Sequence, residues 1–299
     1  MKISVIRVVA LGLLFAVQAG AQDADLAEQE AVTAPGAELE LVADGYIFTE
    51  GPAADENGVV YFTDQPNDRI LKCDLDGKVT TWMQPAGRSN GLFFAPDGKL
   101  IACADGNNEL WAIAPDKSHK VLLKGFEGKR FNGPNDVWVD KNGTLYFTDP
   151  FYKRPYWTHK NPKPQLPRQV YRLDVGGKQP VVAAMDFKQP NGIVGDAEKR
   201  VVYIADIGDK KTYRFKISEN GELIERELFC EMGSDGMTLD GDGNLYLTGK
   251  GVTVFSSTGK KIDHIDVPEG WTANVCIGGR ERKTLFITAS DSLYQIELK

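Results

Sequence analysis

The sequence predicts an all-β protein built from six copies of one four-stranded unit, and three observations support this. A strand-ending phrase such as Tyr146-Phe147-Thr148-Asp149 recurs, and its last residue falls at positions 64, 105, 149, 206, 249 and 289. Tight hairpin signals, such as Asn142-Gly143, separate segments of alternating polarity. No helical periodicity of comparable strength is found. Four antiparallel strands repeated at this period predict a six-bladed β-propeller rather than a solenoid or a sandwich.

The units can be followed in order along the chain. The spacings of the phrase are 41, 44, 57, 43 and 40 residues, so the single long spacing marks an insertion. In the first unit a third strand, 69–74, turns at Asp76-Gly77 into a fourth, 78–82. The last unit ends with 292–298, which supplies a third strand but no fourth. We therefore expect the strand at 38–42 to complete the last blade and remove an exposed sheet edge.

The N-terminus has the pattern of a signal peptide. Lys2 and Arg7 precede an apolar run of about ten residues, which is shorter than the roughly 20 that cross a bilayer, and Ala19-Gly20-Ala21 is a cleavage site. An amphipathic N-terminal helix is the alternative. The pattern predicts a signal peptide at 1–21, a flexible leader at 22–37 and a single propeller domain at 38–299. We expect an exported protein, periplasmic or secreted, with no membrane contact after cleavage.

Composition excludes some classes of partner. Of the 299 residues, 42% are hydrophobic, which is ample for a large core. The net charge is −7 and no basic stripe is present, so nucleic acid is not an expected partner. The chain is expected to be a monomer or a weak dimer. Four widely spaced cysteines without a C-x-x-C motif indicate small buried hydrophobic residues rather than a disulfide framework; they are Cys73, Cys103, Cys230 and Cys276.

Six oxygen-bearing residues open the first strands of the six units. The first strand of each blade lines the central channel of a propeller, so equivalent positions face one axis. An oxygen-only cluster suits a hard divalent cation, with Ca²⁺ favoured and Mg²⁺, Mn²⁺ or Zn²⁺ as alternatives. The six residues, with Asp136 beside them, are Glu50, Asn90, Asn135, Asn191, Asp235 and Asn274.

A purely structural interpretation of these residues is that Asn-Gly and Asp-Gly are turn sequences that tolerate left-handed backbone. That interpretation accounts for three or four of the copies. It does not account for Glu50, a poor turn former, or for Pro134-Asn135-Asp136. The functional interpretation is therefore favoured.

Four motifs then point to a family. Thr49-Glu50-Gly51-Pro52, Pro134-Asn135-Asp136-Val137, Pro190-Asn191-Gly192 and Ser234-Asp235-Gly236-Met237 resemble the senescence marker protein, gluconolactonase and luciferin-regenerating enzyme family over roughly residues 40–299. The resemblance implies one divalent metal held by Glu50, Asn191 and Asp235, with Asn135 as a substrate and further metal contact. Many members have an arginine at the position of Gly133, and the nearest arginine here is Arg130.

The resemblance implies a metal-dependent lactonase that opens a sugar lactone to its aldonic acid. A divalent ion with open positions polarises the lactone carbonyl and activates water. Asp235 is the first candidate for the general base and Asp136 the second. The predicted substrate contacts are Asn90, Asn135, Arg130, Asn274, Tyr152 and Arg154.

The insertion between blades three and four spans 150–168. It carries several aromatic residues and Arg154, and loops of this length are usually functional. It is a candidate lid over a sugar-like ligand, with a plain surface excursion as the alternative.

Other chemistries fit less well. No G-x-S-x-G motif occurs, and none of the three histidines lies where a blade begins, which disfavours a Ser-His-Asp hydrolase. Asp240–Asn244 resembles the start of an EF-hand loop, but the position that needs Glu is Gly251. A non-catalytic propeller that binds a sugar or protein partner on its channel face, with a structural metal, remains the alternative function. A strictosidine synthase-like or paraoxonase-like activity is a third.

Overall fold

The computed structural model describes residues 31–158 and 162–299. The predicted signal peptide, 1–21, and the leader up to residue 30 lie outside the described residues. Val32–Lys299 forms one compact unit, which contains all the strands found in the described residues. In the described part of the chain, no helix is both long and apolar enough to cross a membrane.

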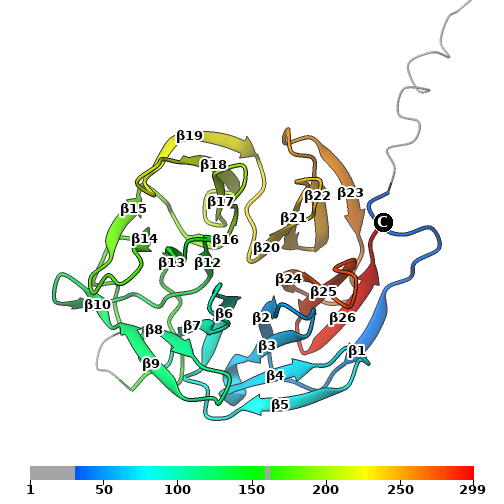
Figure 1. Ribbon diagram of the computed structural model, residues 1–299, viewed down its shortest axis with the longest axis horizontal. Helices are drawn as coiled ribbons and strands as arrows, with labels where there is room; N and C mark the ends of the chain where they lie inside the picture. Colours follow the sequence, from blue (N-terminus) through cyan, green and yellow to red (C-terminus); the bar gives the residue numbers. More distant parts are fainter. Residues whose placement is uncertain (1–30, 159–161) are drawn as a thin grey trace, which may run out of the picture. The chain divides into compact units, whose positions relative to one another are not determined.

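Six four-stranded antiparallel sheets surround a central axis, which confirms the predicted six-bladed propeller (Figure 1). In every blade the first strand is innermost (Figure 1). The first three blades are β2 (Thr49–Ala54), β3 (Val60–Asp64), β4 (Arg69–Cys73) and β5 (Val79–Met83); β6 (Ser89–Phe94), β7 (Leu100–Ala104), β8 (Glu109–Ile113) and β9 (His119–Leu123); and β12 (Val137–Val139), β13 (Leu145–Asp149), β14 (Gln169–Leu173) and β15 (Val181–Ala184).

The remaining blades follow the same order. They are β16 (Pro190–Asp196), β17 (Val201–Asp206), β18 (Lys211–Ile217) and β19 (Leu223–Cys230); β20 (Met237–Leu239), β21 (Leu245–Gly249), β22 (Gly251–Phe255) and β23 (Lys261–Ile265); and β24 (Thr272–Gly278), β25 (Thr284–Ala289), β26 (Ser292–Glu297) and β1 (Glu40–Ala43). A short hairpin, β10 (Gly125–Phe126) and β11 (Lys129–Arg130), and one 3₁₀ turn, η2 (Gln65–Asn67), lie between blades or strands.

The predicted hairpin turns form as the sequence indicates. In blade three, Gly143 adopts φ 89° and its N–H donates to the carbonyl of Asp140 at 2.7 Å. A β-branched or bulky residue would be strained at this φ, so the Asn142-Gly143 pair fixes the register of β12 against β13. This turn lies at the end of β12 that is remote from Asn135.

The ring closes as predicted. β1 pairs antiparallel with β26, with Leu41 opposite Tyr294, and completes the sheet of the last blade. The chain is already held before β1, because the N–H of Val32 donates to Asp263 Oδ2 at 2.9 Å and Thr33 forms a β-bridge with Leu298. Val32 and Thr33, which lie inside the segment predicted as a flexible leader, are therefore held against the propeller.

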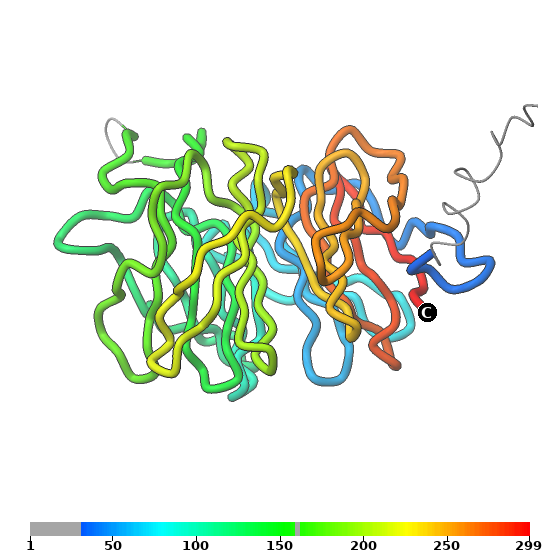
Figure 2. Tube along the Cα trace, turned by 90° about the horizontal axis from the view of Figure 1, so that it is seen from above, coloured from blue at the N-terminus to red at the C-terminus, as the bar shows by residue number. Residues whose placement is uncertain are grey.

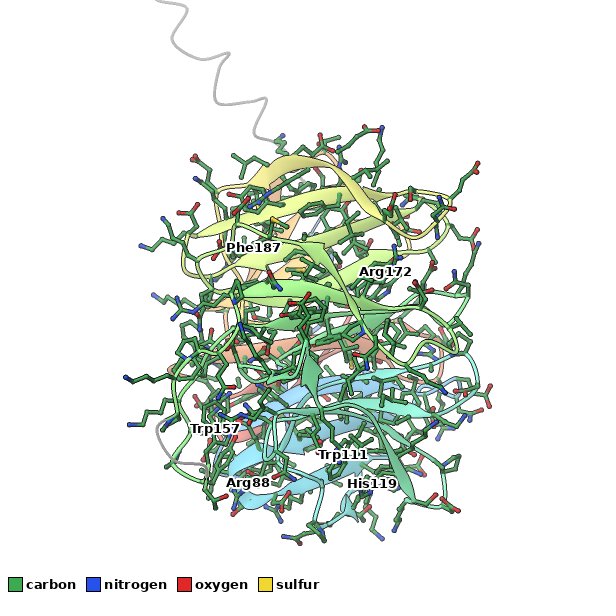
Figure 3. All side chains as sticks on the ribbon, turned by 90° about the vertical axis from the view of Figure 1, so that its left-hand side faces the viewer. Arg88, Trp111, His119, Trp157, Arg172 and Phe187 are labelled. Atoms are coloured by element: carbon green, nitrogen blue, oxygen red, sulfur yellow. The ribbon has the colours of Figure 1, made fainter. Side chains whose placement is uncertain are left out.

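Apolar side chains from neighbouring blades pack between the sheets. The largest cluster joins Trp138 of blade three to Phe215 of blade four and Phe255 of blade five. Near the rim of blade two, Trp111 stacks on His119 with ring centroids 3.8 Å apart (Figure 3). All four cysteines are buried and free, which confirms their prediction as small core residues.

Candidate functional site

All six predicted residues stand where their blades begin. Glu50, Asn90, Asn191 and Asn274 lie within the first strands of their blades, and Asn135 and Asp235 each lie two residues ahead of theirs. None of the six is among the residues with positive φ in the described chain. The alternative that they are left-handed turn residues is therefore wrong.

The glycines in these motifs are required by crowding at the axis. A Cβ on Gly51 would lie 2.1 Å from the carbonyl oxygen of Asn90, and one on Gly236 would lie 1.9 Å from Asn274 Cγ. Each glycine thus touches the oxygen-bearing residue of the next blade, where only a residue without Cβ fits. Gly91 and Gly192 make the same approach, to Asn135 and Asp235.

Hydrogen bonds tie the side chains together in two groups. Asn191 Nδ2 donates to Asp235 Oδ1 at 2.6 Å and to the Tyr152 hydroxyl at 2.9 Å. Trp271 Nε1 donates to the other oxygen, Asp235 Oδ2, at 2.6 Å. In the second group, Asn274 Nδ2 donates to Glu50 Oε2 at 3.2 Å. The carboxylate of Asp235 is therefore oriented at both oxygens.

The buried carboxyl groups of Glu50, Asp136 and Asp235 form an acidic cluster. Burial raises the pKa of Glu50 well above its ordinary value, and the charges of Asp235 and Asp136 raise it further. Burial also raises the pKa of Asp235, and that of Asp136 to about 7. Within the described residues, none of the three pairs with a lysine or arginine at ion-pair distance. A bound cation would neutralise this cluster.

Among the amide oxygens that are buried without a partner in the described part of the chain, which include Asn108 Oδ1, two belong to the predicted ring of ligands: Asn90 Oδ1 and Asn191 Oδ1. Their residues are 3% and 1% exposed. A buried acceptor without a hydrogen bond is costly unless another ligand satisfies it. Because Asn191 uses its amide nitrogen on Asp235 and Tyr152, its oxygen remains for a cation.

The donor set fits a hard cation. Among residues 31–158 and 162–299, no group of three or more His, Cys, Asp or Glu side chains is arranged so that it could hold a metal ion by itself, so a metal here needs amide oxygens as well as carboxylates. Oxygen ligands of mixed charge are those that Ca²⁺ and Mg²⁺ prefer.

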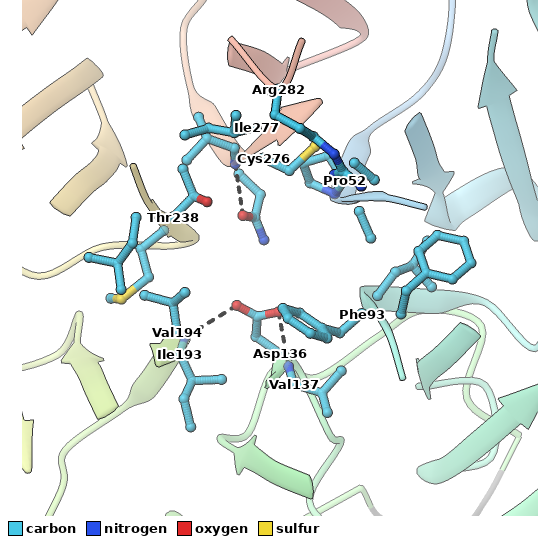
Figure 4. Close-up of a pocket in the computed structure, with 18 residues that line it drawn as sticks. Pro52, Phe93, Asp136, Val137, Ile193, Val194, Thr238, Cys276, Ile277 and Arg282 are labelled. Atoms are coloured by element: carbon cyan, nitrogen blue, oxygen red, sulfur yellow. Dashed lines mark hydrogen bonds between the residues drawn. The ribbon is translucent and has the colours of Figure 1, made fainter. Parts of the chain in front are cut away.

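Asp136 lies on the channel side of the cluster. Its Oδ1 accepts from the N–H of Val137 at 3.0 Å and its Oδ2 from that of Ile193 at 3.2 Å, so it joins blades three and four. The side chain points into an axial cavity of about 220 Å³ that is lined by the first strands of the blades (Figure 4).

The structure does not bring Arg130 to this cluster. Arg130 pairs with Gly125 in the β10–β11 hairpin, and Figure 1 shows β10 at the outer edge of the propeller. At Gly133, φ is 142° and a Cβ would lie 2.7 Å from Asp105 Oδ1 and 3.3 Å from Trp157. The insertion thus occupies the space that a side chain at position 133 would need.

The insertion does reach the oxygen cluster. Seen edge-on in Figure 2, the green segments on both sides of the gap at residues 159–161 lie at the upper face of the propeller. Tyr152 contacts Asn191 through the hydrogen bond above, and the Arg154 guanidinium lies 5.4 Å from the centre of the Tyr152 ring. Residues 150–158 are therefore not a surface loop remote from the oxygen cluster, which was the alternative interpretation of the insertion.

Sequence reasoning missed Trp271. This residue is 38% exposed and directly precedes β24, so its place at the start of a repeat was visible in the sequence. An exposed tryptophan at that position is a signal for a ligand contact.

Comparison with known proteins agrees with this geometry. Residues 48–291 match the family model described as the SMP-30/Gluconolactonase/LRE-like region. The chain belongs to this family. A gluconolactonase of Zymomonas mobilis is 27% identical, covering 87% of this chain and 81% of its own length, and a 6-deoxy-6-sulfogluconolactonase of Pseudomonas putida is 27% identical, covering 78% and 79%. The solved structure of a gluconolactonase from Xanthomonas campestris aligns with a TM-score of 0.82 at 27% identity, covering 90% of this chain and 91% of that one.

Proposed function

We propose that this protein is a divalent-metal-dependent lactonase that opens a sugar lactone to its aldonic acid. The lactonases among its relatives support the substrate class. The observation that carries the metal dependence is the buried, unpartnered oxygen of Asn191 beside the carboxylate of Asp235.

Glu50, Asn191 and Asp235 would hold the cation, with Asn135 as a fourth ligand and Ca²⁺ as the first choice. When bound, such an ion polarises the lactone carbonyl and lowers the pKa of water. Asn274 holds Glu50 in place through its amide N–H.

The protein's own groups would move the proton and bind the sugar. Asp235 is the proposed general base, because Trp271 and Asn191 orient both of its oxygens. Asp136 is the second candidate, and the backbone N–H groups of Val137 and Ile193 orient its two oxygens. Substrate hydroxyl groups would meet Asn90, Asn135 and Tyr152, and the Tyr152 hydroxyl accepts from Asn191 and keeps its own proton to donate.

The experiment is hydrolysis of glucono-1,5-lactone, followed as acid release at constant pH with spontaneous opening subtracted. The proposal requires a saturable rate that rises in proportion to the amount of protein. If this lactone and a panel of related lactones open no faster than in buffer, the lactonase proposal fails.

Cation affinity should increase with pH. Asp136 holds a proton below a pH of about 7, and the raised pKa values of Glu50 and Asp235 favour further protons in the cluster, which a cation must displace. Calorimetric titration with Ca²⁺ should therefore show proton release and at least about tenfold weaker binding near pH 5.5 than near pH 8. An affinity that does not change over this range would contradict the assignment of Glu50 and Asp235 as ligands.

We also infer from residues 1–21 that the protein is exported. N-terminal sequencing of the protein recovered outside the cytoplasm should begin near Gln22. Recovery of full-length protein from the cytoplasm alone would contradict export.

A further inference from the structure

Aspartates at the ends of second strands hold the loops that precede the first strands of the same blades. In blade one, Asp64 Oδ1 accepts from the N–H of Ile47 at 3.2 Å. In blade three, Asp149 accepts from the N–H groups of Asn132 and Gly133 at 3.0 and 2.9 Å. In blade four, Asp206 does the same for Lys188 and Gln189. The strand-end aspartates of blades one, three and four thus fix the backbone ahead of Glu50, Asn135 and Asn191.

Blade two departs from this rule. Its loop is held instead by Asp68, whose Oδ1 accepts from the N–H groups of Ala86 and Arg88 at 3.0 and 2.6 Å. Asp105, the strand-end aspartate of this blade, is only 3% exposed; its Oδ2 accepts from Gln65 Nε2 at 3.3 Å and is also available to a further partner.

That partner is the insertion. Asp105 Oδ2 accepts from Arg154 Nε at 3.0 Å and from the Tyr156 hydroxyl at 2.6 Å, and its main-chain oxygen accepts from Trp157 Nε1 at 2.8 Å. Arg88 stacks on the Tyr156 ring at 4.4 Å, and the labelled Arg88 and Trp157 mark this junction in Figure 3. Charge-assisted hydrogen bonds to a buried carboxylate are among the strong ones in proteins.

The far end of the insertion is fixed as well. Asn132 Oδ1 accepts from the N–H of Gln165 at 3.0 Å, and Asn132 Nδ2 donates to the carbonyl of Leu166 at 3.0 Å. Since Asp149 fixes the backbone of Asn132 itself, the insertion is tied to the same framework that presents Asn135.

We propose that Asp105 is a positioning residue that fixes 150–158 as a permanent wall of the substrate pocket. This wall holds Tyr152 where its side chain can contact the hydroxyl groups of a lactone bound beside Asn191. It therefore selects lactones whose rings carry hydroxyl groups. The inference rests on the proposed lactonase function. It assigns to Asp105 a role in specificity that acts through Tyr152 and Arg154 rather than by contact with the reacting atoms.

The test compares Tyr156→Phe and Asp105→Asn with Tyr246→Phe as a matched control. The control removes a hydroxyl that donates to Asp240 Oδ2 at 3.0 Å, beside a hairpin turn remote from the insertion. The substrates are glucono-1,5-lactone and δ-valerolactone, which has the same ring and carbonyl without hydroxyl groups. Hydrogen exchange of 150–158 reports the anchoring independently.

Tyr156→Phe should lower the kcat/KM ratio of glucono-1,5-lactone to δ-valerolactone by about 3- to 10-fold, mainly through KM, and Asp105→Asn by more. Exchange in 150–158 should accelerate in both variants, and Tyr246→Phe should change neither quantity. Faster exchange with an unchanged ratio would overturn the selective role, and unchanged exchange would overturn the anchoring role. If the wild type opens neither lactone, the proposed function and the proposed selectivity fail together. The hydrogen-exchange measurement still tests whether Asp105 anchors residues 150–158.

Discussion

Asp235→Ala should reduce the rate of sugar-lactone hydrolysis by about 10²–10⁴-fold, the range typical of the loss of a positioned general base. The substitution also removes the carboxylate to which Asn191 and Trp271 donate, so the proposed ion would lose a ligand. Initial rates with saturating glucono-1,5-lactone and added Ca²⁺ measure the effect.

Asp266→Ala is the matched control, because the Asp266 side chain is 97% exposed and should be replaceable without loss of activity. A folded Asp235→Ala variant that keeps more than about a tenth of the wild-type rate would remove Asp235 from the catalytic role.

Gly236→Ala should destabilise the protein and weaken cation binding at the same time. The added methyl would lie 1.9 Å from Asn274 Cγ, so blades five and six must separate or Asn274 must release Glu50. Overpacking of this kind costs about 1–3 kcal/mol, which lowers the Tm by roughly 2–10 °C in a chain of this size. Thermal unfolding with and without Ca²⁺ measures both effects.

Gly241→Ala is the control for Gly236→Ala. Gly241 lies near the end of the same first strand, its φ is not in the left-handed region, and a Cβ there would meet nothing within 4 Å. The free energy of unfolding should change by no more than about 0.5 kcal/mol. Equal Tm values for the two variants would show that the close approach of Gly236 to Asn274 is not needed.

The fold could be predicted because its main determinants are periodic in the sequence. The hairpin signal at Asn142-Gly143 and the recurring Thr-Asp phrase define the blades, and an unpaired strand at each end of the chain implies that the ring closes. The six positions from Glu50 to Asn274 follow from the same period, since equivalent positions on radial blades face one axis.

The details of the site could not be predicted, because they depend on contacts between blades. Arg130 is close to Gly133 in sequence, but the hairpin carries it to the outer edge (Figure 1). Asp105 ends its strand with the same kind of signal as Asp149. In the structure, however, Asp68 binds the loop of this blade, and Asp105 binds Arg154 of the insertion instead. The sequence also allows turn propensity as an explanation of the Asn-Gly motifs. The contacts between blades that require glycine exist only in the closed ring, so the sequence alone does not reveal them.

Removal and replacement of the cation test the central claim most directly. Purified protein is stripped with a chelator, freed of the chelator, and assayed with glucono-1,5-lactone before and after addition of Ca²⁺, Mg²⁺, Mn²⁺ or Zn²⁺. The account predicts that stripping abolishes turnover, that at least one ion restores it, and that the same ion raises the Tm. Full lactonase activity in the stripped protein would contradict the metal-dependent mechanism.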